Sequence, residues 1–421
     1  MPTRAGRELF LRAQAAGEDG ASCCPPVAVA ACGGARGACE GLFAAQHLRR
    51  GRCIFTERAL HSFRVPDGSG LPTCAHCQRG LATAEEALGA ADAARLPLPE
   101  RWPRRAGCSA ACEACGALFC SPPCLRAARR THHARLCGGA LGELAAHGAR
   151  ATYGAAATLP LLGARVVAEL LVERQAALER LGGGGEAGEE ARQALPPPLE
   201  SASIASFCGA EGLAGEGEDY FDAAGHERWY EWTCRALRLA PAERAWLPFA
   251  AYADLMRRVA CNTIRLTPRS PFTAYFSAMR RAKRPGSDGC EAAVGEVLAL
   301  AESRHGGNAT AAGDECGAAK GATGLRAASA ALEASCATAA GAMFTLACKI
   351  NHACEPNVAV HSFTFDDATV DVVALRDIRA GEELHISYVD PSLPRGTRRK
   401  LLREQYSFEC DCERCVCEAG T

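Results

Sequence analysis

Eight residues between Cys74 and Cys137 have the types and spacing of zinc ligands. They form the groups Cys74-x2-Cys77, Cys112-x2-Cys115, Cys120-x3-Cys124 and His133-x3-Cys137. A structural zinc ion takes four cysteine or histidine ligands, so eight ligands can hold two ions. His132 is an alternative to His133, which we choose because its three-residue spacer to Cys137 fits one helical turn. Cys108 belongs to no pair, and we expect it to be a free thiol.

A second cluster, near the carboxyl end, reads Cys410-x-Cys412-x2-Cys415. It supplies three thiolates, one fewer than a closed tetrahedral site needs. Cys417 is a spare ligand or a competitor for Cys415. The chain has 25 cysteines and no secretory signal, and 421 residues can build a core without disulfides. We therefore interpret the clustered cysteines as metal ligands.

Two further segments carry the most specific pattern in the chain. Residues 351–357 read NHACEPN, and residues 381–388 read GEELHISY. Together they resemble the two signature motifs of the SET domain, in which the two segments cross in a threaded, knot-like arrangement and form the active site. The resemblance implies methyl transfer from S-adenosylmethionine to a lysine ε-amine. Such an in-line displacement depends on alignment and needs no covalent enzyme intermediate.

The resemblance also implies roles for individual residues. Tyr388 corresponds to the catalytic tyrosine, whose hydroxyl would orient the amine and the methyl group. The expected cofactor-binding residues are Gly41, Asn351, His352, Tyr406, Phe408 and Asn262. Asn351 would use its side-chain amide and His352 its main chain, which leaves the His352 ring free to be a satisfied core histidine. Cys39 replaces the first glycine of the cofactor strand and adds a side chain where backbone must approach the ligand.

The cysteine-rich block resembles the MYND zinc module, and roughly residues 27–137 and 341–417 resemble the SMYD family of lysine methyltransferases, with the middle of the chain covered only loosely. The resemblance implies three zinc ions. Their expected ligand sets are Cys74, Cys77, Cys120 and Cys124; Cys112, Cys115, His133 and Cys137; and Cys354, Cys410, Cys412 and Cys415. The third set would hold Tyr406 and Phe408 as walls of the pocket, with a role as core fillers as the alternative. The long spacer between Cys77 and Cys112 departs from the compact MYND pattern.

The expected fold class is α+β: a SET-domain β-fold with a threaded knot, interrupted by a MYND zinc module and a helical insert, plus a post-SET zinc cluster. The expected divisions are a disordered leader at 1–26, the N-terminal part of SET at 27–70, the MYND module at 71–140, a helical insert at 141–284 with a linker at 182–200, a partly disordered Gly/Ala-rich insertion at 285–335, the C-terminal part of SET at 336–392 and the post-SET region at 393–421.

Hydrophobic spacing predicts the elements that position these residues. Short strands broken by glycines are expected within 27–65, a packed helix over 161–181, a largely helical segment over 226–281, strands around 358–374 and 383–388, and a basic helix over 397–405.

Composition excludes other classes of protein. The net charge is -1 and the pI is near 6.8, which argues against a protein whose surface grips nucleic acid. If the MYND face does touch DNA, Arg126, Arg129 and Arg130 are the candidates. No run of about 18 uncharged apolar residues occurs, so we expect no membrane partner. We expect a monomer located in the nucleus, the cytoplasm or both.

The expected function is methylation of an accessible lysine on a histone or another protein. The alternative is a MYND interaction module that captures proline-rich peptides, with a SET domain made catalytically weak by Cys39. Members of the family commonly carry a helical-repeat domain after the post-SET cysteines; because this chain stops at Thr421, we expect that domain to be absent and the substrate groove to be more open. Ala353 stands where serine is usual, a mild departure.

Overall fold

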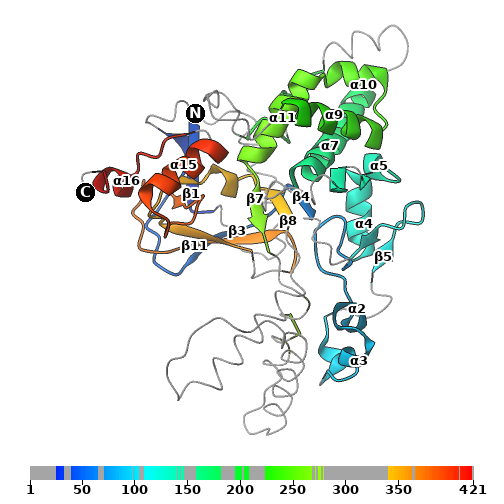
Figure 1. The fold of residues 1–421 in the computed structure, drawn as a ribbon, viewed down its shortest axis with the longest axis horizontal. Coiled ribbons are helices and arrows are strands. Elements are labelled where there is room, and N and C mark those ends of the chain that lie inside the picture. The colour runs from blue at the N-terminus through cyan, green and yellow to red at the C-terminus, as the bar shows by residue number, and fades with distance from the viewer. Residues whose placement is uncertain are drawn as a thin grey trace.

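The computed structural model describes part of the 421-residue chain. The described residues are 25–32, 39–64, 71–96, 98–103, 109–139, 141–142, 144–146, 158–181, 195–201, 203–207, 223–267, 271, 274–275, 278, 340–362, 366–406 and 408–419. Figure 1 shows three regions: strands and C-terminal helices on one side, a group of helices, and a cysteine-rich block. Most of the expected leader, most of the linker and the Gly/Ala-rich insertion lie outside the described residues, as does Cys108.

Strands from both ends of the chain form the β region. β1 (Val27–Cys32) and β2 (Cys39–Ala44) make an antiparallel hairpin; β3 (Cys53–Arg58) pairs with β11 (Thr369–Ala374), which pairs with β10 (Val358–His361); and β8 (Ala340–Met343) lies between β4 (His61–Arg64) and β7 (Ile264–Leu266). The N-terminal segment therefore completes sheets whose other strands follow position 263. These sheets bring residues far apart in sequence to one place.

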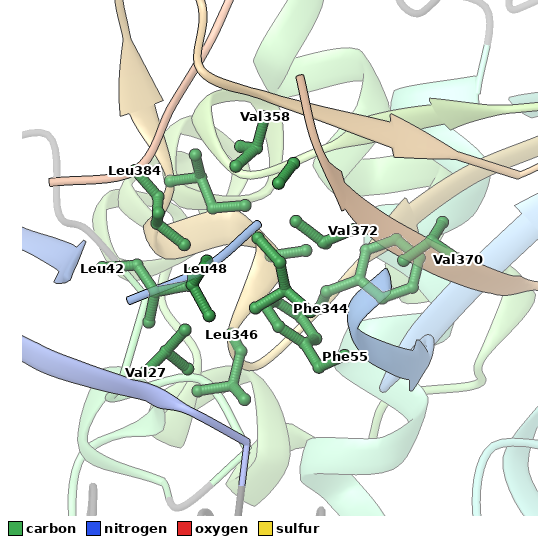
Figure 2. Close-up of a cluster of buried hydrophobic side chains, with 14 of the residues drawn as sticks. Val27, Leu42, Leu48, Phe55, Phe344, Leu346, Val358, Val370, Val372 and Leu384 are labelled. Atoms are coloured by element: carbon green, nitrogen blue, oxygen red, sulfur yellow. The ribbon is translucent and has the colours of Figure 1, made fainter. Parts of the chain in front are cut away.

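A single apolar core joins these strands (Figure 2). Leu42, Phe344 and Val372 are fully buried in it, and Leu384, just before β12, packs there too. Burial of apolar surface contributes roughly 25 cal/mol per Å² to the stability of such a core. The segments before and after the two signature motifs are thereby anchored to one rigid unit.

The helical region consists of α7 (Leu159–Arg180), α9 (Ala223–Ala236), α10 (Pro241–Trp246) and α11 (Phe249–Cys261). α7 begins with Pro160 in its first turn, where a missing N–H costs nothing. Its first thirteen residues are almost all buried, which explains the apolar run of the sequence. Among the described residues, no helix has the length and apolarity needed to cross a bilayer.

Short elements make up the cysteine-rich block, residues 71–137. They are α2 (Ala84–Leu88), α3 (Ala90–Ala93), η1 (Pro99–Arg101), β5 (Ala110–Ala111), β6 (Leu118–Phe119), α4 (Pro122–Arg129) and α5 (His133–Leu136). Ser121 caps α4 by accepting a hydrogen bond from the backbone N–H of Cys124. Cysteines account for several of the few buried apolar side chains here.

Of the remaining elements, Pro198–Glu200 contacts α11, and the others lie in the signature motifs or beside them in the sequence. These remaining elements are η3 (Pro198–Glu200), η4 (Ala347–Lys349), β9 (Asn351–His352), β12 (His385–Ile386), α15 (Arg395–Tyr406) and α16 (Glu413–Cys417). The predicted helix over 161–181 and the basic helix over 397–405 are confirmed to within about two residues. One expectation is wrong in part: Ile264–Leu266 is a strand, because it pairs with β8.

Candidate functional site

The two signature segments lie side by side. β9 pairs with β12 in parallel, with Asn351 opposite His385 and His352 opposite Ile386. The N–H of Ala353 continues the ladder to the carbonyl of Ile386, over 3.0 Å. The pairing places Tyr388 beside His352, since the backbone N–H of Tyr388 donates to His352 Nδ1 over 3.0 Å. Asn351 and Tyr388 therefore belong to one site.

Tyr388 is half-buried in a group of aromatic rings. Its ring centroid lies 4.8 Å from that of Tyr406, 6.4 Å from that of Phe408 and 5.4 Å from that of His352. The Tyr388 hydroxyl donates to the carbonyl oxygen of Ile350 over 2.8 Å. The hydrogen of this hydroxyl is thus committed to the main chain, and its lone pairs remain available to accept.

The ring of His352 is fully buried, and its contacts define its tautomer. Nδ1 accepts the N–H of Tyr388, so Nδ1 carries no hydrogen. Nε2 lies 3.4 Å from Cys354 Sγ and must then carry the proton that it donates to this sulfur. Because both ring nitrogens are engaged within the protein, the imidazole is not placed to exchange a proton with a substrate.

The amide of Asn351 is held in one orientation. Its Nδ2 donates to Glu383 Oε1 over 2.7 Å and approaches the Glu40 carbonyl at 3.3 Å and Cys32 Sγ at 3.1 Å. Acceptors therefore surround the nitrogen, and the oxygen makes none of these contacts. Gly41 lies against the same group, since a side chain at this position would meet Glu383, Cys32 and Asn351.

The side chain of Asn357 forms further hydrogen bonds between the two motifs. Asn357 Nδ2 donates to the carbonyl of Glu383 and to Glu382 Oε1, and Asn357 Oδ1 accepts the N–H of His385 over 2.7 Å. Partial burial alone would raise the pKa of the Glu382 carboxyl, but hydrogen bonds from Arg376, the N–H of Arg379 and Asn357 lower this pKa below its usual value. The carboxylate form therefore holds this contact.

Two charged residues that the motifs do not reveal shape the segment before Asn351. Buried Glu57 accepts the backbone N–H groups of residues 345, 346 and 347 over 2.7 to 2.9 Å. Lys349, 5 % exposed, donates from Nζ to Glu40 Oε2 over 2.7 Å and to the carbonyl of Ser206. Glu40 is the residue whose carbonyl faces Asn351, so the Lys349–Glu40 ion pair fixes β2 beside that amide.

Asn262 caps the end of α11 and is buried. Its Nδ2 donates to the carbonyl of Arg258 over 2.8 Å, and its own carbonyl accepts from Cys348 Sγ. Cys348 lies within three residues of Asn351, which places Asn262 on the approach to the site. The contact with a cofactor expected for it stays a prediction.

The structure brings together each of the three expected ligand sets. The sets are Cys74, Cys77, Cys120 and Cys124; Cys112, Cys115, His133 and Cys137; and Cys354, Cys410, Cys412 and Cys415, with the ligand atoms of each set within 4.8 Å of one another. Four thiolates around zinc at about 2.3 Å lie roughly 3.8 Å apart. Neighbouring sulfur atoms lie 3.5 to 3.9 Å apart, so the donor sets fit this ion.

The structure distinguishes the alternative ligands as well. His133 Nε2 lies 3.6 Å from Cys115 Sγ, whereas His132 Nε2 approaches the carbonyl of Ala75 and its Nδ1 approaches Glu169. Cys415 is buried within the third set, and Cys417 is exposed. The third set packs directly against Tyr388, Tyr406 and Phe408. It therefore adjoins this group of aromatic rings.

Comparison with known proteins agrees with this geometry. The family model for the SET domain matches residues 166–389, more than half of the chain. Protein-lysine N-trimethyltransferase SMYD5 of Homo sapiens is 26% identical over 429 residues, covering 90% of this chain and 84% of that protein. The SET domain and MYND-type zinc finger protein 6 of Schizosaccharomyces pombe is 45% identical over 71 residues, 17% of this chain and 14% of that protein.

A third relative matches over a short segment. Histone-lysine N-methyltransferase SMYD3 of Mus musculus is 47% identical over 66 residues, 16% of this chain and 15% of that protein. The long match to SMYD5 and these short, stronger matches agree on the same kind of protein. The chain belongs to the SET domain family, as a member of its SMYD branch.

Proposed function

We propose that this chain methylates lysine residues of proteins, with S-adenosylmethionine as the methyl donor. The supporting observation is the position of Tyr388, whose hydroxyl donates to the Ile350 carbonyl beside Asn351 and whose ring packs against two further aromatic rings. Two of the similar proteins are named as a protein-lysine and a histone-lysine methyltransferase, which supports the same activity here. The alternative of an interaction module with a weak SET domain is not favoured.

The residues around Asn351 would hold the cofactor. S-adenosylmethionine would supply a sulfonium methyl group and an α-ammonium group. Because acceptors hold the Asn351 nitrogen, its oxygen is left to accept from that ammonium. Main-chain groups of His352 and Gly41 would complete the cradle, with Tyr406 and Phe408 as its walls.

Tyr388 would orient the lysine amine through its lone pairs, because its hydrogen is donated to Ile350. The amine must be neutral to attack, and His352 does not remove its proton, since both nitrogens of that ring are engaged. Burial of the lysine side chain disfavours the charged ammonium by desolvation and lowers the pKa of the lysine. We therefore infer that the proton leaves to solvent as the side chain enters the pocket.

The finer architecture is part of the proposal. The parallel pairing of β9 and β12 supports a threaded crossing of the two motifs. The cysteine-rich block would be a MYND module inserted in the SET fold, with two of three zinc ions, and the third ion would join Cys354 to the C-terminal cysteines. One ligand of the third ion comes from the first motif and three come from the C-terminal segment. Zinc would therefore hold the C-terminal segment against the active site.

The partners follow from the same proposal. The substrate would be a protein with an accessible lysine, on a histone tail or elsewhere. The MYND module would be able to take proline-rich peptides. We further propose that the chain acts as a monomer in the nucleus, the cytoplasm or both.

Labelled S-adenosylmethionine tests the activity. The purified chain is incubated with cell extract, and the labelled proteins are identified by mass spectrometry. Tyr388→Phe should reduce transfer by about 100-fold while calorimetry shows nearly unchanged cofactor affinity. Tyr230→Phe is the matched control, because the Tyr230 hydroxyl also donates to a backbone carbonyl, that of Leu247, far from the site. Absence of cofactor binding by the wild-type chain would refute the proposal.

A further inference from the structure

A buried arginine points at the third cysteine set. Arg398 of α15 is 1% exposed. Its Nε lies 3.2 Å from Cys354 Sγ and its Nη2 lies 3.9 Å from Cys415 Sγ. The same Nη2 donates to Glu418 Oε2 over 2.6 Å, and Nη1 donates to the carbonyl of Leu393 over 2.5 Å. All three guanidinium nitrogens are thus fixed, and two of them face sulfur.

Cys354 receives a second donor from the active site. His352 Nε2 carries the hydrogen that faces Cys354 Sγ at 3.4 Å, because Nδ1 accepts the N–H of Tyr388. The Cys354 sulfur therefore lies between two N–H donors, from Arg398 and from His352. Among the cysteines of this set, it is the one that comes from the signature motif.

The charge of the set explains why these donors matter. Four thiolates and one Zn²⁺ carry a net charge of about -2. Three of the four cysteines are buried, and a buried charge is costly unless it is paired and hydrogen-bonded. An arginine stays protonated in proteins, so Arg398 offers a permanent positive charge against the thiolates. Groups that surround metal ligands in this way contribute to metal affinity.

We propose that Arg398 is the positioning residue of the C-terminal zinc site, and that Cys354 and His352 relay the state of this site to Tyr388. The part concerning zinc rests on the chain's own donors, while the relay to catalysis rests on the function proposed above. With zinc bound, the Cys354 thiolate accepts from both neighbours and holds the His352 ring. Loss of the ion would free this thiolate and, with it, the ring that anchors the Tyr388 backbone.

Zinc release tests the first part. Wild-type protein with three zinc ions is mixed with a chromophoric chelator, and release is followed over time. Arg398→Met keeps a long side chain without charge, and one of the three ions should leave about 10- to 100-fold faster. Arg398→Lys keeps the charge but lacks the planar guanidinium. Its rate of zinc release should lie between those of the wild type and Arg398→Met. Lys400→Met is the matched control, because Lys400 lies on the same helix but faces solvent.

Cobalt substitution gives a readout that general destabilisation does not mimic. Co²⁺ replaces zinc, and the sulfur-to-cobalt charge-transfer band reports donors to the thiolates. Arg398→Lys and His352→Asn should each shift this band, while Lys400→Met should not. His352→Asn keeps an acceptor near Nδ1 but removes the donor toward Cys354. Unchanged zinc release and an unchanged band in both Arg398 variants would overturn the proposal.

Methylation assays separate this inference from the proposed function. If the wild-type chain methylates no protein but the Arg398 variants lose zinc faster, the zinc role of Arg398 stands and the relay to catalysis falls. If the chain is active and both Arg398 variants retain zinc at the wild-type rate with an unchanged cobalt band, the proposed function stands and the inference fails.

Discussion

A methyl group at Gly41 would lie 2.5 Å from Glu383 Oε1, a distance that no stable packing allows. Glu383 is the residue that accepts from the amide nitrogen of Asn351. The glycine of β2 therefore leaves room for a carboxylate of the second motif, which in turn orients the asparagine of the first. Three segments that meet only in the folded chain define one hydrogen-bonded group.

Gly41→Ala should weaken cofactor binding far more than folding. The Glu383 side chain can swing away from the new methyl group, but its bond to Asn351 is then lost. We expect the dissociation constant for S-adenosylmethionine to rise about tenfold, equivalent to one hydrogen bond of about 1.4 kcal/mol, with a small change in melting temperature. Calorimetry and thermal unfolding measure the two effects.

Gly396→Ala is the control for this substitution. Gly396 lies in α15, and a methyl group there meets nothing within 4 Å. It should leave cofactor affinity unchanged and stabilise the helix by about 0.5 to 1 kcal/mol. Equal affinities of Gly41→Ala and wild type would contradict the geometry at β2.

The hydrogen bonds to the Glu382 carboxylate predict that stability depends on pH. The pKa of this carboxyl is lower in the folded chain than the value of about 4.3 in the unfolded chain. Its contribution is therefore complete above about pH 4.3 and is lost as the pH falls toward the folded pKa. Glu382→Gln lacks the charge, so the wild type should exceed it in stability by a constant amount near neutral pH and by less below that value.

Urea unfolding at a series of pH values measures this difference. Both proteins contain the same zinc ligands, so acid release of metal affects both alike. Asp377→Asn is a suitable control, since the Asp377 carboxylate accepts only from the exposed backbone N–H of Arg50 in the described contacts. If the difference in free energy of unfolding between wild type and Glu382→Gln grew in acid, the predicted direction of the pH dependence would be wrong.

The ion pair between Lys349 and Glu40 should act on cofactor affinity. Lys349→Met leaves Glu40 without its partner and loosens the strand whose carbonyl faces Asn351, so we expect about tenfold weaker binding. The double variant Lys349→Glu with Glu40→Lys should recover part of the loss, and a double-mutant cycle gives the coupling. The exposed pair Lys400–Glu404 serves as control, where the same cycle should give less than about 0.5 kcal/mol. Additive effects at Lys349 and Glu40 would remove the pair from the site.

Residues recognised by a local pattern were predictable from the sequence. The cysteine spacings and the NHACEPN segment can be recognised along the chain, because zinc geometry and the motif each restrict which residue types stand at neighbouring positions. The structure brings these ligands together in the expected sets. It also places Tyr388 against His352, as the parallel pairing of β9 and β12 requires.

The partners of these residues were not predictable. Glu383, Lys349 and Arg398 are ordinary surface residue types, and each finds its role only through tertiary contacts. Lys349 meets Glu40 across 309 positions, a separation that no periodicity encodes. The strand Ile264–Leu266 was missed for a related reason: its conformation comes from pairing with β8 and not from its own propensity.

A buried charge cluster joins the cysteine-rich block to the rest of the chain and supports a last prediction. Glu169 of α7 accepts from His61 Nδ1 over 2.6 Å and from Arg165 Nε over 3.0 Å, and it approaches His132 at 3.4 Å. Burial alone would raise the pKa of Glu169, but the charge of His61 and the hydrogen bonds from His132 and His61 hold it well below its usual value. One carboxylate therefore serves β4, α7 and the segment that carries His133.

Removing that carboxylate should destabilise the fold. Glu169→Leu removes the carboxylate partner of Arg165, 3% exposed, whose other acceptors are the carbonyl oxygens of Ser62 and His76, and breaking a buried ion pair costs about 3 to 5 kcal/mol. Glu179→Leu on the same helix is the control, because the Glu179 side chain is exposed and bonds only to Gln175 in the described contacts, so a change below about 0.5 kcal/mol is expected. Urea unfolding of the zinc-loaded proteins measures both. If Glu169→Leu lowered the free energy of unfolding by less than about 1 kcal/mol, the prediction would fail. Hydrophobic packing, and not the ion cluster, would then hold the cysteine-rich block against α7.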